Sequence, residues 1–405
     1  MGYLKVALRG ISWMAGLRAV TRGLAVIKLA ILARILLPSQ FGIYGIATLV
    51  LGFLEMATET GINIFLIQEK EKINKYVDSA WVISIVRGTL ISILIIISVP
   101  FITRFFSVPS ASYILYLTSL IPIIRGFINP AAISFQKNLE FNKQFYYDST
   151  IFFFEALLAV ALGVVTKSEN SLILAMIFAA VLEVALSFIV FNPKPKFKLK
   201  TPLVKRIIER GKWITGAGVF NYLFQNIDDI LVGKLLGTGP LGIYQQAYKI
   251  STLPVSEVGE IFNKVTFPIY ATIEGDKARL KKVFIKTLLV ILALVIPFGL
   301  VVFYFPFTIV SLVLGENWLP AVPVLQVLAI FGVLKAIFNS FFALLLGIGR
   351  QEIVTFATLA STLVMVTITY PLIQIFGILG AAFAAIISTL VAFPILIYYL
   401  WKFLR

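Results

Sequence analysis

The chain carries the stretch Arg34-Ile-Leu-Leu-Pro-Ser-Gln-Phe-Gly-Ile-Tyr44, which recurs 200 positions later as Lys234-Leu-Leu-Gly-Thr-Gly-Pro-Leu-Gly-Ile-Tyr244. The copies align without a gap, and upstream of them Arg9-Gly10 recurs as Arg210-Gly211. In each copy a long apolar run ends, the chain turns tightly, and another apolar run begins. A recurrence at half the chain length indicates two similar halves rather than a short-period solenoid. We therefore favour a duplication over a chance match.

The composition is that of a membrane protein. Of the 405 residues, 60% are hydrophobic and 13% charged, whereas soluble domains carry about 25% charged residues. Runs of 18 or more apolar residues recur from end to end, which is typical of transmembrane helices. The weak alternation of membrane β-barrels is absent. The sequence therefore predicts an all-α, polytopic membrane protein.

Several kinds of chemistry are excluded by the residues that the chain lacks. It has no Cys and no His, so disulfides and thiolate chemistry are ruled out, and the usual zinc ligand and proton shuttle are missing. We expect no metal site, no catalytic residues and no cofactor. No Gly-x-x-x-x-Gly-Lys-Ser/Thr loop is present, so ATP-driven work would need another subunit. The first apolar run lacks an obvious cleavage site, so we expect it to stay in the membrane.

Twelve transmembrane spans are predicted, separated by turn-forming residues. They are 11–36, 40–66, 78–103, 111–135, 144–166, 171–192, 209–236, 240–268, 284–310, 320–347, 351–376 and 378–401.

The distribution of positive charge predicts the orientation. Lys and Arg gather on alternate loops, and by the positive-inside rule that side is cytoplasmic, with both termini there. The same rule explains the net charge of +16 better than nucleic-acid binding does. Six helices in each half give a parallel repeat. We thus expect a bundle over 1–192, a basic cytoplasmic linker over 193–208 that lies on anionic lipid headgroups, and a second bundle over 209–405.

Charged residues fall inside the predicted spans, where each costs about 2.5–3.5 kcal/mol on insertion scales. The cations of the first half include Arg18, Arg22, Arg87 and Arg125. Some of these charges are expected to pair with acids as structural contacts. The count nevertheless indicates more buried cations than acids in this half, which favours a lumen for anions. Because arginine binds phosphate with two hydrogen bonds, these four residues are candidates for binding a phosphate group.

Other polar residues within the spans are candidates for the cavity lining or for proton or sodium coupling. They are Glu55, Glu59, Asp228, Lys249, Glu257, Glu260 and Lys264. The last four are part of a narrow stripe at helical spacing, which requires water or polar neighbours.

Ordered motifs along nearly the whole chain resemble one transporter family. The opening motif Leu32-Ala-Arg34 through Tyr44 is similar to the start of Wzx-type polysaccharide and O-antigen flippases, in the MATE-like multidrug/oligosaccharidyl-lipid/polysaccharide exporter superfamily. Asn226 through Gly237 and Leu241 through Tyr248 resemble that family's seventh and eighth helices. Further similar motifs are Phe267-Pro-Ile-Tyr270, Pro297, Leu314-Gly-Glu-Asn-Trp318 and Gly347-x-Gly-Arg350.

The resemblance implies two six-helix bundles in a V shape, with a cavity that opens to either side of the plasma (inner) membrane in turn. It implies transport of a polyprenyl-diphosphate-linked oligosaccharide, such as an O-antigen repeat unit of lipopolysaccharide, to the outer leaflet. The family's helix-seven aspartate corresponds to Asp228. In relatives a cationic cavity engages the diphosphate, and the candidates for this role here are the four arginines named above, chosen from their spacing and not from a matched motif. Membrane lipid, a polysaccharide polymerase and chain-length proteins are the expected partners.

Three alternatives remain open. The first is an ion-coupled multidrug antiporter on the same fold, which would favour an acidic, aromatic cavity for cationic drugs. The second is a membrane enzyme such as a polymerase or glycosyltransferase, although no sizeable loop with catalytic carboxylates is present. The third is a purely structural subunit, which the cost of so many intramembrane charges disfavours.

Overall fold

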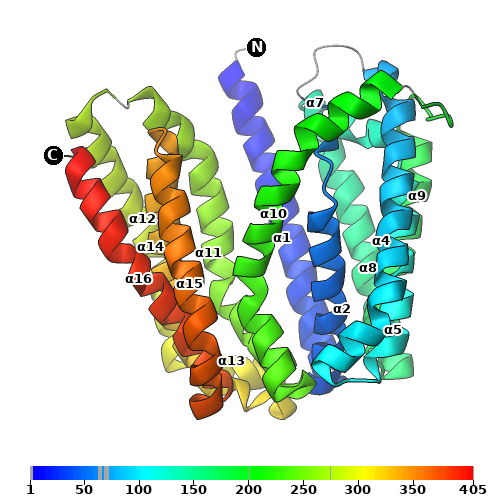
Figure 1. Ribbon diagram of the computed structural model, residues 1–405. Coiled ribbons are helices and arrows are strands. Elements are labelled where there is room, and N and C mark those ends of the chain that lie inside the picture. The colour runs from blue at the N-terminus through cyan, green and yellow to red at the C-terminus, as the bar shows by residue number, and fades with distance from the viewer. Residues whose placement is uncertain (1–2, 63–65, 68–72, 200, 274, 405) are drawn as a thin grey trace. The chain divides into compact units, whose positions relative to one another are not determined.

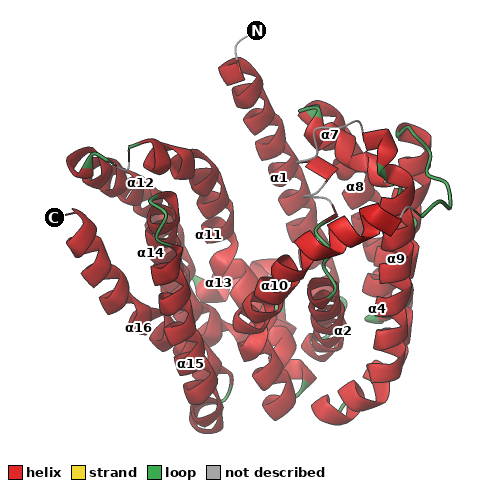
Figure 2. Cartoon of the chain, turned by 45° about the horizontal axis from the view of Figure 1, so that its top comes forward, coloured by secondary structure: helices red, strands yellow, loops and turns green. Residues whose placement is uncertain are grey.

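The computed structural model describes residues 1–405 except 1–2, 63–65, 68–72, 200, 274 and 405 (Figures 1 and 2). Within described helices, the side chains of 3–9, 11, 74, 201–217, 254–265, 267–268, 271 and 404 also lie outside the description. All regular elements of the described part are α- or 3₁₀-helices, which confirms the all-α prediction.

The contacts divide the chain into two compact units, the N-terminal unit Met1–Gln225 and the C-terminal unit Asn226–Arg405. The N-terminal unit contains α1 (Tyr3–Ala33), α2 (Pro38–Ala57), η1 (Ile73–Lys75), α4 (Val77–Phe106), α5 (Ala111–Thr118), α6 (Leu120–Gly126), η2 (Pro130–Ile133), α7 (Ser134–Lys137), α8 (Phe141–Thr166) and α9 (Asn170–Val190). Helix α10 (Thr201–Leu236) contains the boundary. The C-terminal unit continues with α11 (Thr238–Thr272), α12 (Lys277–Tyr304), α13 (Pro306–Val313), η3 (Glu316–Trp318), α14 (Ala321–Gly347), α15 (Gln351–Phe376) and α16 (Ile378–Leu404).

The chain is a multi-pass membrane protein. Among the described residues, eight helices are long and apolar enough to cross a membrane, namely α2, α4, α8, α9, α12, α14, α15 and α16. A ninth span results if the bent pair Ala111–Gly126 and Pro130–Lys137 is counted as one. Helices α1, α10 and α11 are as long as these spans but carry more charge.

The outer faces of these helices are apolar, as lipid contact requires. Helix α8 exposes Phe152, Phe153, Phe154 and Leu157, and only 17% of its most apolar window is buried within the protein. An exposed row of large apolar side chains in water would promote aggregation. In a bilayer the same side chains contact the hydrocarbon chains of the lipids, which is favourable.

Three predicted spans differ from the structure, and one of them, 284–310, is broken at Phe305 between α12 and α13. The span predicted for 40–66 is a helix only to Ala57, because the chain turns at Thr58–Thr60 and Gly61 adopts a φ of +65°. The span predicted for 111–135 is broken, and its two parts meet at 72°. Pro130 explains the second break, because proline disfavours a helical conformation in the residue before it.

Each repeated stretch lies at the junction between two long helices, α1 and α2 or α10 and α11, but the two turns differ. The first has four non-helical residues, Arg34 through Leu37, whereas the second has Gly237 alone. The first turn places Pro38 at the start of α2, where proline lacks only a hydrogen bond that the helix would not make. The second uses Gly237 at a φ of +92°. The duplication itself stays a prediction.

Helices α4 and α6 cross closely within the N-terminal unit. A Cβ atom on Gly88 would lie 2.2 Å from the backbone oxygen of Pro122, and one on Gly126 would lie 2.9 Å from that of Ser84. Small residues allow membrane helices to approach closely without a bulky interface. The crossing brings Arg87, which precedes Gly88, and Arg125, which precedes Gly126, to the same region.

In the C-terminal unit, α14 packs against α11, α12 and α16. Its Phe338, Phe341 and Leu344 join a buried cluster with Leu280 and Phe284 of α12. One turn earlier, Ala336 packs with Ile291 and Val295. The C-terminal half of α14 is therefore packed among apolar side chains.

The segment between α9 and α10 is extended and held on the N-terminal unit. The Asn129 side chain donates to the Pro193 oxygen at 3.1 Å, and the Lys196 amide donates to Asp78 Oδ1 at 2.9 Å. The ring of Phe197 lies 4.5 Å from that of Trp81, centre to centre. The predicted linker over 193–208 is thus non-helical to Leu199, and α10 begins at Thr201.

Candidate functional site

A polar cavity lies inside the N-terminal unit, with a volume of about 400 Å³. Its charged lining residues come from five helices: Glu55 of α2, Arg87 of α4, Arg125 of α6, Asp148 of α8 and Glu183 of α9. Gln136, Gln144 and Tyr147 add further polar groups. Five charged groups around one space inside a helix bundle require either internal pairing or a polar occupant.

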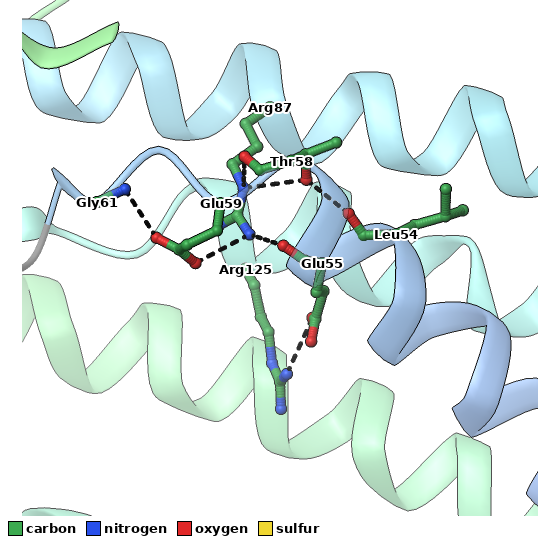
Figure 3. Close-up of polar contacts among 7 residues, drawn as sticks. All are labelled: Leu54, Glu55, Thr58, Glu59, Gly61, Arg87 and Arg125. Carbon is green, nitrogen blue, oxygen red and sulfur yellow. Dashed lines mark hydrogen bonds and ion pairs between the residues drawn. The ribbon is translucent and has the colours of Figure 1, made fainter. Parts of the chain in front are cut away.

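Arg87 caps the end of α2 (Figure 3). Its Nε donates to the backbone oxygen of Thr58 at 2.8 Å, and its Nη2 donates to the backbone oxygen of Glu55 at 2.6 Å. The last carbonyls of a helix lack partners within the helix and attract cations. Nη2 also meets Glu59 Oε2 at 3.3 Å, while Glu59 Oε1 accepts from the Gly61 amide. These contacts make Arg87 a residue that holds the α2 terminus.

Arg125 is held less tightly. Its Nη1 lies 3.5 Å from Glu55 Oε1, and 40% of its side chain is exposed (Figure 3). Its Nε is buried and has no hydrogen-bond partner among the described residues. A guanidinium carries five N–H donors. Arg125 therefore has donors available for a group that enters the cavity.

Acids and cations are balanced differently from the prediction. The cavity is lined by three carboxylates, Glu55, Asp148 and Glu183, and by two arginines. The expected excess of cations is therefore wrong for this lining. Asp148 was overlooked in the sequence, and both arginines form ion pairs with glutamates in α2 or just beyond its end. Elsewhere in the unit, Lys28 Nζ contacts both carboxylate oxygens of Glu155, at 2.8 and 2.9 Å. The alternative that such charges pair internally is confirmed for these contacts.

The four predicted diphosphate ligands are not all brought together. Arg87 and Arg125 line the cavity, whereas Arg18 and Arg22 of α1 do not. Arg18 is half-buried and Arg22 exposed. Helix α1 packs on α8, where the Trp13 ring lies 5.3 Å from that of Phe145. Of the four arginines predicted to act together, the cavity lining thus includes only the pair Arg87 and Arg125.

A second polar group lies within the C-terminal unit. Asp228 of α10 is only 4% exposed, and its Oδ2 accepts from the Tyr244 hydroxyl at 2.6 Å. One turn along α11, the Tyr248 hydroxyl accepts from Lys335 Nζ of α14 at 2.7 Å. The Asp228 and Lys335 charges interact electrostatically. Lys335 is absent from the sequence-predicted set, although a single lysine in a long apolar run marks it.

The other predicted polar residues have different outcomes. Lys249 is exposed on α11, where its charge interacts with that of Asp229. The side chains of Glu257, Glu260 and Lys264 lie outside the described residues. In the described part of the chain, no group of three or more His, Cys, Asp or Glu could hold a metal ion.

The polysaccharide biosynthesis protein family matches residues 31–323 of this chain. The chain belongs to the polysaccharide biosynthesis protein family. It is a family of membrane transporters, not of enzymes. An uncharacterized membrane protein in the cps region of Klebsiella pneumoniae is 27% identical over 90% of this chain and 76% of its own length. The lipopolysaccharide biosynthesis protein WzxC of Escherichia coli K12 is 24% identical, over 87% and 72%.

Solved structures with the same fold are transporters of the superfamily that the sequence resembles. The lipid II flippase MurJ, in an inward closed conformation, has a TM-score of 0.75 and 15% identity, over 96% of this chain and 87% of MurJ. An inward-facing MATE family multidrug resistance transporter has a TM-score of 0.68 and 14% identity, over 95% of both chains. The fold is therefore MATE- and MurJ-like.

Proposed function

We propose that this transporter moves a polyprenyl-diphosphate-linked oligosaccharide, a repeat unit of a surface polysaccharide, from the cytoplasmic to the outer leaflet of the plasma membrane. The family match over residues 31–323 carries the proposal. WzxC, named for lipopolysaccharide biosynthesis, and MurJ, named as a lipid II flippase, support this substrate class. The family's role in polysaccharide biosynthesis would place a polymerase and chain-length proteins beside it.

We further propose twelve spans, with both termini cytoplasmic. Helices α1, α10 and α11 have 31, 36 and 35 residues, and about 20 residues suffice to cross a bilayer. Adding them to the eight apolar helices and the bent pair completes two sets of six. The mechanism that fits such a pair of parallel bundles is alternating access. The exposed lysines at the start of α12, among them Lys277, Lys281 and Lys282, support the proposed orientation.

Arg125 is the residue proposed to bind the diphosphate. It faces the cavity, and it has an N–H donor that no described residue uses. Arg87 supports the site by fixing the end of α2, beside Glu55. Arg18 and Arg22 stay candidates for a contact outside this cavity. Proton coupling would involve acids among Glu55, Glu59, Asp228, Glu257 and Glu260, and sodium coupling would involve the same acids apart from Asp228. Lys249 and Lys264 lie nearby in sequence.

The proposal is tested by flipping in liposomes. Purified protein is reconstituted with a labelled polyprenyl-diphosphate oligosaccharide, and wild type is compared with Arg125→Ala and Arg22→Ala. We expect wild type to move the lipid and Arg125→Ala to reduce the rate at least ~10-fold, because loss of a charged hydrogen bond costs about 1.5–3 kcal/mol. Arg104→Ala is the matched control, since Arg104 is exposed and outside the cavity.

A multidrug antiporter is the second candidate, and one observation favours it. The cavity combines three carboxylates with Tyr147, a lining that suits organic cations. Efflux of a cationic dye without lipid movement would support this candidate and reject the first. Lipid movement that survives Arg125→Ala would keep the function and remove Arg125 from the site.

A further inference from the structure

Lys335 is a cation in the middle of an apolar helix. It is the fifteenth of the 27 residues of α14, which is one of the candidate membrane spans. A lysine at such a depth is unfavourable unless it faces a partner or a cavity. Its Nζ donates to the Tyr248 hydroxyl at 2.7 Å and lies 5.0 and 5.5 Å from the ring centres of Tyr248 and Phe331. Both distances are typical of cation–π interactions.

The acidic side of this group comes from α10. Asp228 accepts a hydrogen bond from Tyr244, which is completely buried. The neighbouring Asp229 has a buried Oδ1 with no hydrogen-bond partner among the described residues. Two adjacent, largely buried carboxylates repel each other, so at least one positive charge or proton is needed nearby.

Helix α11 connects the two sides. Tyr244 and Tyr248 are four residues apart and so share one face, and their ring centres are 6.1 Å apart. One hydroxyl binds the Asp228 carboxylate and the other binds the Lys335 ammonium. The two opposite charges are thereby held at a fixed separation within the C-terminal unit.

Other charged groups near this network are few in the described residues. Asp229 of α10 and Lys249 of α11 interact with each other. The described charged residues of α12, α15 and α16 lie toward the ends of those helices, as in the basic start of α12 and Lys402 of α16. Lys335 is therefore the positive charge that α14 itself supplies to the acidic pair.

We propose that Lys335 is a counter-ion built into the chain for the Asp228–Asp229 pair, so that this site holds no free sodium or potassium ion. The covalent tether gives the ammonium a high local concentration at the site, and its charge repels a second cation. Sodium coupling through Asp228 is then excluded while Lys335 is charged. The inference goes beyond the proposed transport function, and its test does not depend on a sugar-lipid substrate.

The test is thermal unfolding of the purified full-length protein in detergent, in sodium, potassium or choline chloride at equal ionic strength. The wild-type Tm should be the same in all three salts. Lys335→Met should lower the Tm by about 5 °C or more, because it removes the positive charge that interacts with the buried Asp228 carboxylate. Sodium or potassium should then raise the Tm of this variant in a saturable manner, since a free cation can replace the lost charge.

Two further variants keep the result interpretable if Lys335→Met does not fold. The double variant Asp228→Asn/Lys335→Met removes both charges, so it should fold, recover most of the lost Tm and show no response to sodium. Lys282→Met is the matched control, since Lys282 is an exposed lysine of the same unit, and it should behave as wild type.

Three outcomes would overturn the proposal. One is a wild-type Tm that rises with sodium or potassium relative to choline. Another is a Lys335→Met variant with unchanged stability. The third is a double variant that is no more stable than the single one, which would mean that Lys335 is needed for packing rather than for its charge.

Discussion

Arg125 in the N-terminal unit and Lys335 in the C-terminal unit are both cations in helices with apolar surroundings, but each is held differently. Arg125 meets Glu55 at 3.5 Å, is 40% exposed and lines a cavity. Lys335 meets a tyrosine hydroxyl at 2.7 Å beside two aromatic rings, and its acidic partner Asp228 is 4% exposed. The residue that we propose as a ligand is thus loosely paired beside an open space. Short hydrogen bonds within the packing mark an internal counter-ion.

The largest effect on this comparison should come from the helix crossing that positions Arg125. Gly88→Ala would place a methyl group 2.2 Å from the Pro122 oxygen, and backbone cannot move as a flexible side chain does. We expect a loss of about 3 kcal/mol in the free energy of unfolding, measured by denaturant or thermal unfolding in detergent. Gly23→Ala is the control, because its Cβ would meet nothing within 4 Å. Equal stability of both variants would show that the crossing does not hold the cavity together.

A smaller effect should separate the two regions by their tyrosines. Tyr244→Phe leaves the buried Asp228 without its 2.6 Å hydrogen bond, which should cost about 2 kcal/mol in unfolding free energy. Tyr147→Phe removes a 3.2 Å bond to the Glu183 backbone oxygen beside the cavity. Water can replace that bond, so the cost should be about 0.5 kcal/mol. Unfolding midpoints of the two variants check this order, and the reverse order would break the comparison.

The smallest effects should come from exposed ion pairs, one in each unit. Lys143 meets Glu140 at 2.8 Å, and Arg350 meets Glu352 at 3.5 Å. Glu140→Gln and Glu352→Gln should each change the unfolding free energy by less than about 0.5 kcal/mol, because exposed pairs gain little over hydration. The same unfolding measurement could show a much larger loss for one of the two variants. That result would mean that the strength of an ion pair depends on the unit in which it lies and not on how exposed it is.

Much of the fold could be predicted from local sequence. Long apolar runs and turn residues identified the helices and the repeated turn before Tyr44 and Tyr244. The break at Pro130 and the early end of α2 at Ala57 were not predicted. Turn-forming residues do stand at both places, Asn129-Pro130 and Thr58 through Gly61, but each predicted span was continued because apolar residues resume on the far side. Apolar character indicates depth in a membrane, but it does not indicate where the backbone bends.

The sites were harder to predict, because pairing depends on which helices are neighbours. Arg87 was selected as a ligand from its depth alone, yet it binds the end of α2 through backbone oxygens that any sequence would offer. Arg18 and Arg22 share a face of α1, but a shared face does not show what faces it. Lys335 and Asp148 carried a visible signal, a charge within a predicted span, and could have been found.

The extended segment between α9 and α10 changes which bonds a protease can cut. Lys196 and Lys198 make it a target for trypsin by composition. A protease needs a stretch of backbone that leaves the fold, and this one is fastened through the Pro193 oxygen, the Lys196 amide and the Phe197 ring. The rate of cleavage there would report how often the segment detaches from Asp78 and Trp81, and would therefore measure local unfolding of this part of the chain.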